Sequence, residues 1–119
     1  MNQIKKQMKL KKGEYYQTHL SLVNCVLPVK LTPMEIKVLA SFMSLTGDIA
    51  KDRFGTTAKK IVKEDLGITS AGMSNYLRSL KDKGFLLENK DETLTILPIL
   101  FPQKEEQVYM FKLINSECY

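Results

Sequence analysis

One segment, residues 69–86, constrains the fold of this 119-residue chain more than any other. Apolar side chains recur in it at steps of four and three residues, which is the spacing of the buried face of a helix. These side chains are Met73, Leu77 and Leu80. Thr69 suits the N-cap of this helix, and Gly84 suits the left-handed residue that ends one. The segment therefore predicts a short helix that runs into an apolar strand beginning at Phe85.

The opposite face of the same helix is polar. It carries Ser70, Ser74, Asn75, Arg78 and Lys81. Small hydrogen-bonding groups followed by a guanidinium match the donors and acceptors that bases present in a DNA major groove. Exposed serines and arginines are also common as ordinary solvated residues. The polar face is therefore a candidate nucleic-acid surface, and the fold around it decides how strongly it indicates DNA binding.

Two further helices are predicted ahead of this one. The first starts at Thr32, which can cap it, with Pro33 in the first turn and Glu35 completing a capping box. It is expected to end at Gly47 and, because its apolar stripe is wide, to form the centre of the core. The second is expected to run from residue 56 or 57 to 67. The short turn that follows it is typical of a helix-turn-helix unit.

A hairpin is predicted after the third helix. Phe85-Leu86-Leu87 and Thr93-Leu94-Thr95-Ile96-Leu97 are the two strands, and the polar stretch 88–92 is the tip. Arg53-Phe54 is expected to form a very short strand. Tyr15 to Val29 is also predicted as a strand, because its first half alternates apolar and polar side chains. Gln107 to Ile114 is predicted as a last strand that is apolar on both faces.

Residues 31–97 resemble a winged helix domain of the MarR-like or phage replication-initiator-like kind. The resemblance rests on three motifs: Leu31-Thr32-Pro33-Met34-Glu35, Asp65-Leu66-Gly67-Ile68-Thr69, and residues 73–80 with Lys83-Gly84-Phe85-Leu86. It implies an α+β fold, a winged helix-turn-helix of three helices and a β-hairpin wing, with additional N- and C-terminal β-strands. The expected organisation is a flexible basic arm over residues 1–13 and a single domain over 14–119, with its core at 31–97.

The resemblance also implies a partner, double-stranded DNA. Ser70, Ser74, Asn75 and Arg78 would face the DNA, with Lys59 and Lys60 near its backbone. The expected function is that of a small transcription or replication regulator, from a phage or mobile element. Two features depart from the family. The hairpin tip has three acids against one lysine, which phosphates would repel, and the long flanking helices of MarR-type dimers are absent.

The net charge of +5 is concentrated at the N-terminus. Five lysines and no acid occur in the first twelve residues, whereas thirteen basic and thirteen acidic side chains cancel over the remainder. A basic arm of this kind can add phosphate contacts that do not depend on sequence. The alternative is a solvated tail that only aids solubility. Both readings of the arm stay open at the level of sequence.

Catalysis finds no support in the sequence. The single histidine, His19, has no partner carboxylate at a telling spacing, and no glycine-rich phosphate loop is present. Cys25 and Cys118 lack the spacing of a zinc site, so we expect no metal, no cofactor and no small-molecule ligand. No apolar run is long enough to cross a bilayer. With two cysteines and no secretory signal, we expect a cytoplasmic protein that does not interact with membranes.

A second class of function competes with DNA binding. Winged helices also serve as protein-interaction modules, including structural components of phages, and a fold does not determine a function. The acidic tip, the neutral body and the apolar terminal strands all favour that alternative. If the strand Gln107–Ile114 pairs with the segment Leu20–Leu27 of the same or another chain, we expect a homodimer through the terminal strands.

Overall fold

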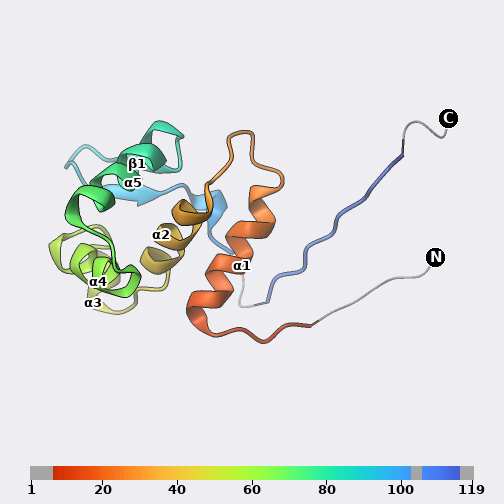
Figure 1. The fold of residues 1–119 in the computed structure, drawn as a ribbon, viewed down its shortest axis with the longest axis horizontal. Coiled ribbons are helices and arrows are strands. Elements are labelled where there is room, and N and C mark those ends of the chain that lie inside the picture. The colour runs from red at the N-terminus through yellow and green to blue at the C-terminus, as the bar shows by residue number, and fades with distance from the viewer. Residues whose placement is uncertain (1–6, 103–105, 116–119) are drawn as a thin grey trace.

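The structure, a computed structural model, describes residues 7–102 and 106–115. Within them the chain has an α+β fold, in which five helices precede a two-stranded antiparallel hairpin (Figure 1). The elements are α1 (Lys12–Asn24), α2 (Pro33–Met43), α3 (Asp48–Lys51), α4 (Thr56–Leu66), α5 (Ser70–Asp82), β1 (Leu86–Glu88), β2 (Leu94–Ile96) and the 3₁₀ turn η1 (Pro98–Leu100). The prediction of an α+β fold is confirmed. So are the second and third of the predicted helices and the hairpin.

The central element of the core is α2, as its wide apolar stripe predicts. It contacts α1, α4 and α5, and its largest buried side chains are Leu39, Phe42 and Met43. The capping box is present, because the Thr32 hydroxyl accepts from the Glu35 backbone and the Glu35 carboxylate accepts from the Thr32 backbone. The helix ends at Met43 rather than at Gly47.

Two glycines end the helices where the sequence predicts. Gly67 follows α4 with a φ of 65°, and Gly84 follows the last turn of α5 with a φ of 84°, both in the left-handed region. Between the helices, the Thr69 hydroxyl accepts a hydrogen bond from the Gly72 backbone at 3.0 Å and caps α5. The chain therefore turns sharply from α4 into α5, and from α5 into the hairpin.

The hairpin pairs Leu86 with Ile96, Leu87 with Thr95 and Glu88 with Leu94. Its inward side chains, Leu86 and Ile96, are buried against the helices. The very short strand predicted at Arg53-Phe54 does not form. That stretch follows the one-turn helix α3, and it packs the Phe54 ring against Phe42 instead of joining the sheet.

The N-terminal strand prediction is wrong. Residues 12–24 form the helix α1, which packs on α2 (Figure 1). Tyr16, Leu20 and Val23 contact the core at steps of four and three residues, a helical spacing that underlies the apparent alternation. The predicted arm therefore ends where α1 begins at Lys12, and its described part, residues 7–11, lies outside any helix or strand.

The C-terminal strand prediction is also wrong. The chain over 107–115 is extended but belongs to no strand, and it runs away from the globular part (Figure 1). Its expected pairing with Leu20–Leu27 cannot form, because Leu20 lies buried in α1. Tyr109 attaches the segment to α1: its hydroxyl donates to Nδ1 of His19, whose Nε2 donates to the Leu100 carbonyl at 2.9 Å.

Candidate nucleic-acid interface

The outward face of α5 carries all five of the polar side chains that the sequence predicts there. Ser70, Ser74, Asn75, Arg78 and Lys81 are all exposed. Met73, Leu77 and Leu80, on the other side of the helix, are buried in the core. The helix therefore presents a continuous polar face of small hydrogen-bonding groups at its start and cations further along.

Lys81 is partly neutralised by the hairpin. Its Nζ lies 3.6 Å from a carboxylate oxygen of Glu88 on β1, and both side chains are well exposed. An exposed ion pair of this kind contributes little to stability, because water screens it and the side chains lose entropy. Of the two cations on this face, Arg78 is thus the one whose charge no described ion pair offsets.

The two lysines predicted on α4 lie in different surroundings. Lys60 is exposed, whereas Lys59 is half-buried and lines a groove of about 510 Å³ between α3, the start of α4 and the hairpin. Asp91 and Glu92 of the hairpin tip line the same groove. Lys59 therefore shares this groove with acidic groups, whereas Lys60 does not line it.

Sequence reasoning missed Lys63. Its Nζ donates to the Ser70 hydroxyl at 2.9 Å, so it joins the last turn of α4 to the first turn of α5. The signal was present, because Lys63 stands three residues after Lys60 and thus on the same side of α4. Lys63 therefore adds a positive charge beside the N-terminus of α5, and Lys60 lies one turn earlier on α4.

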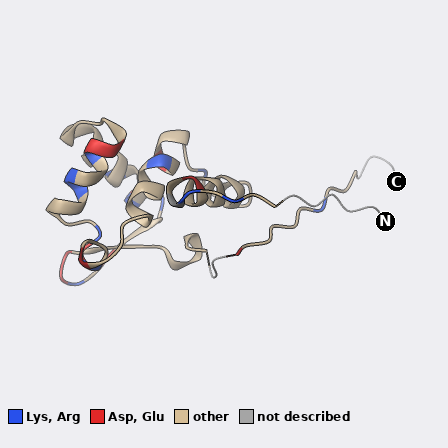
Figure 2. Cartoon of the chain, turned by 90° about the horizontal axis from the view of Figure 1, so that it is seen from below, with Lys and Arg blue, Asp and Glu red and all other residues tan. Residues whose placement is uncertain are grey.

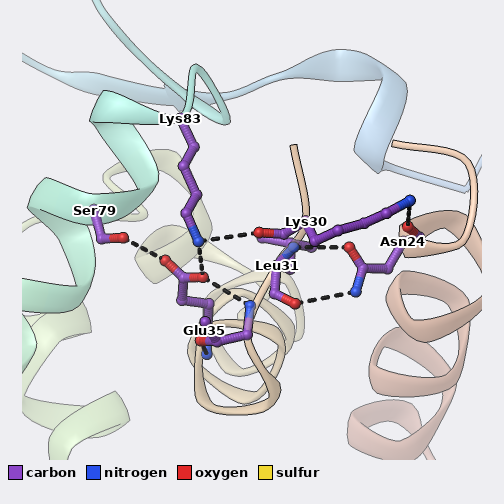
Figure 3. A network of polar contacts seen from close by, with 7 residues as sticks. Asn24, Lys30, Leu31, Glu35, Ser79 and Lys83 are labelled. Atoms are coloured by element: carbon purple, nitrogen blue, oxygen red, sulfur yellow. Dashed lines mark hydrogen bonds and ion pairs between the residues drawn. The ribbon is translucent and has the colours of Figure 1, made fainter. Parts of the chain in front are cut away.

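A buried carboxylate holds α5 in place. Glu35 of α2 is 2% exposed, and it accepts hydrogen bonds from the Ser79 hydroxyl and the Lys83 ammonium, each at 2.6 Å (Figure 3). Lys83 also donates to the carbonyl of Lys30 at 3.0 Å. The residue that caps α2 thus fixes the C-terminal half of α5. The sequence predicts the cap, but not this second role.

The pKa of the Glu35 carboxyl reflects two opposing effects. Burial, the larger single effect, raises it, but the hydrogen bonds from Lys83, Ser79 and Thr32 together lower the pKa below its ordinary value. The carboxylate is therefore ionised at neutral pH and pairs with the Lys83 ammonium. This ion pair lies on the side of α5 that faces α2, away from the candidate surface.

Charge of both signs covers the globular part. Figure 2 shows basic positions on the helices interspersed with acidic ones. The hairpin tip is acidic as the sequence indicates, because Glu88, Asp91 and Glu92 are all exposed. The described part of the basic arm runs away from α4 (Figure 1). A nucleic acid would therefore meet favourable charge on α5 and the end of α4 rather than on the hairpin.

Metal binding has no candidate cluster in the part of the chain that the structure describes. No cluster of three or more histidine, cysteine, aspartate or glutamate side chains there could hold a metal ion. No described helix has both the length and the apolar character needed to span a membrane. The described cysteine, Cys25, is an exposed free thiol, and Cys118 lies outside the described residues.

Comparison with known proteins found no match to this chain among protein-family models, curated proteins or solved structures. The binding partner of the α5 surface is therefore inferred from the side chains of that surface and from the way α2, α4 and the hairpin hold them.

Proposed function

We propose that this protein binds double-stranded DNA through the outward face of α5, as a winged helix-turn-helix protein. The observation that carries the proposal is the exposure of Ser74, Asn75 and Arg78 along one face of a helix whose other face is buried. A helix of this width fits the major groove, where such side chains can meet base edges.

The arrangement of the neighbouring elements supports this proposal. The helices α2, α4 and α5 contact one another, and a sharp turn at Gly67 joins α4 to α5. The hairpin follows α5 directly. This order is the one in which helix-turn-helix proteins insert their second helix while the first lies across the DNA backbone.

The proposed contacts divide into two kinds. Asn75 and Arg78 would read base edges, since an amide suits adenine and a guanidinium suits guanine. Lys63, beside the N-terminus of α5, and Lys60, one turn earlier on α4, would contact phosphates and position the helix. Lys59 would contribute less than the sequence suggests, because it lies beside acidic groups in the groove. The acidic hairpin tip would stay away from the DNA.

Alanine variants of Arg78 and Lys60 test the proposal. Binding to labelled duplexes of several sequences is measured by fluorescence anisotropy over a series of salt concentrations. We expect Arg78→Ala to lose about 1–3 kcal/mol of discrimination between duplexes. Lys60→Ala should instead weaken binding to all duplexes alike and reduce the slope of log affinity against log salt by about 1.

Lys37→Ala is the matched control, because Lys37 is an exposed cation on α2 and not on α4 or α5. It should bind like the wild type. Absence of duplex binding by the wild type at low salt would contradict the proposal and favour a protein-interaction role. Equal losses in Arg78→Ala and Lys37→Ala would show that net charge, rather than α5, attracts the DNA.

A further inference from the structure

Residues 108–114 leave the globular part as an extended chain whose side chains are mostly exposed (Figure 1). Val108 is 93% exposed and Met110 is 89% exposed, whereas Tyr109 between them is half-buried. Within this stretch Tyr109 makes the hydrogen bond and the ring contact with the globular part, and both go to His19 of α1. The contact between these two side chains therefore decides whether the stretch stays on α1.

The two partners of His19 determine which of its ring nitrogens carries the hydrogen. A carbonyl oxygen can only accept, so Nε2, which lies 2.9 Å from the Leu100 carbonyl oxygen, carries the hydrogen of the neutral ring. Nδ1 then has a lone pair, and the Tyr109 hydroxyl donates to it. The neutral imidazole of α1 thus joins two later parts of the chain, η1 and the C-terminal segment.

Protonation of His19 removes the acceptor that Tyr109 uses. Both ring nitrogens of an imidazolium carry hydrogens, so Nδ1 can no longer accept from the hydroxyl. The hydroxyl would have to turn its own hydrogen away, and the positive charge would stay in a site that leaves His19 only 5% exposed. Burial already lowers the pKa of this imidazole below its ordinary value of 6.5. The charged ring therefore favours an arrangement in which Tyr109 has left and water reaches Nδ1.

No described ion pair includes His19, so no counter-ion holds a charge on its ring. The titratable groups linked to its contact with Tyr109 are phenols and one cation. Tyr15 interacts with Tyr109, and Arg53 interacts with Tyr16, one turn before His19. The other described charged side chains on α1, α2 and the segment are either bonded elsewhere or exposed to solvent, namely Glu14, Glu35, Lys37, Glu106 and Lys112. The surroundings therefore favour the neutral ring as long as Tyr109 covers it.

We propose that His19 and Tyr109 form a pH-sensitive latch, which holds residues 108–114 on α1 while His19 is neutral and releases them when it is protonated. The latch is closed above pH 6.5 and opens progressively below it, because the ring takes up a proton more readily once Tyr109 has left. The core keeps α1 in place, since Leu20 on the next position of that helix is fully buried. This inference is independent of DNA binding.

An NMR titration of the isotope-labelled full chain from about pH 8 to about pH 5 follows both halves of the latch. His19 is the only histidine in the sequence, so the signal of its Cε1 hydrogen reports its protonation without ambiguity. We expect the amide signals of residues 108–114 to change with the same midpoint, and their heteronuclear NOE to fall toward that of a mobile chain. Segment signals that stay constant while His19 becomes protonated would overturn the proposal, as would a His19 signal that does not titrate in this range.

Two variants separate protonation from release. Tyr109→Phe removes only the hydroxyl, so the pKa of His19 should rise toward 6.5 and the segment should be mobile throughout the titration. A glutamine does not titrate, so the segment signals of His19→Gln should not respond to pH. Phe111→Ala is the matched control, because it changes an aromatic side chain of the same segment that is 53% exposed and not bonded to His19, and it should titrate like the wild type. If Tyr109→Phe leaves the pKa of His19 unchanged, the latch does not exist.

Discussion

At the scale of single residues, the Glu35 carboxylate joins three parts of the fold. It caps α2, accepts from Ser79 of α5 and pairs with Lys83 just beyond that helix. Lys83 is itself placed by the carbonyl of Lys30. A buried charge is tolerable only when hydrogen bonds replace its water, and here the Thr32 backbone N–H, the Ser79 hydroxyl and the Lys83 ammonium all donate to it. Glu35 should therefore matter for stability and for the position of α5.

Replacing Glu35 should destabilise the protein strongly. We expect Glu35→Ala to lower the free energy of unfolding by about 3 kcal/mol, the lower end for breaking a buried pair, because Lys83 keeps some access to water. Urea denaturation measures the effect. Glu64→Ala, which removes an exposed carboxylate from α4, is the matched control and should stay near the wild type. Similar losses in the two variants would refute the structural role of Glu35.

His19 should make stability depend on pH. Burial lowers the pKa of its imidazole below the ordinary value of 6.5, against a smaller raising effect of the Leu100 carbonyl. The unfolded chain therefore takes up a proton near pH 6.5 while the folded chain does not, so stability is full above that pH and falls below it. His19→Gln should flatten this decline in urea denaturation between pH 7.5 and 5.5. An equally steep decline in the variant would rule out His19 as its source.

At the scale of elements, Arg53 completes α2. Its guanidinium donates to the carbonyls of Phe42, Met43 and Leu45 at 2.7, 3.2 and 3.3 Å, and it lies over the Phe101 ring. The last carbonyls of a helix lack partners within it, and a cation there also suits the helix dipole. These three hydrogen bonds explain how the loop after α2 is held in place, although the strand predicted at Arg53-Phe54 does not form.

Removing the Arg53 side chain should cost about 2–3 kcal/mol of stability, because three carbonyls lose a charged donor. Arg53→Lys should lose less, since it keeps the charge but not the planar fork. Thermal and urea unfolding would report both. Lys51→Ala serves as the comparison, because its ion pair with Asp48 is almost fully exposed. If Arg53→Ala unfolds like Lys51→Ala, the cap on α2 is not what holds this loop.

The elements that sequence predicts correctly are those with local signals. A capping box at Thr32 and glycines at residues 67 and 84 mark helix ends by their own chemistry, so α4, α5 and the start of α2 could be read directly. The segment of α1 carries two periods at once. The alternation of apolar and polar side chains there favoured a strand, but the spacing of Tyr16, Leu20 and Val23 is helical, and packing on α2 selects the helix.

The rest of the candidate site depends on contacts between distant residues. The exposed face of α5 follows from its own periodicity, whereas the bonds from Ser79 and Lys83 to Glu35 span more than forty residues of sequence. The placement of Lys59 beside the hairpin is likewise tertiary. Residues 107–114 have strong β-propensity, but a strand needs a ladder partner, and the described part of the chain provides none for them.

At the scale of the whole molecule, α4 and α5 lie at one end of the fold (Figure 1). The molecule is longest, at 54 Å, along the direction in which the arm and the C-terminal segment extend away from α4 and α5 (Figure 1). The groove beside β2 adjoins Lys59 but not Lys60 or Arg78.

The central claim is that α5 meets the DNA and the hairpin tip does not. Amide chemical shifts of the isotope-labelled full chain, recorded while a short duplex is added, test this most directly. We predict that the largest changes fall on residues 60–63 and 70–81, and that residues 89–92 of the acidic tip barely change. Changes at the tip or the N-terminal arm, with α5 unaffected, would contradict the account.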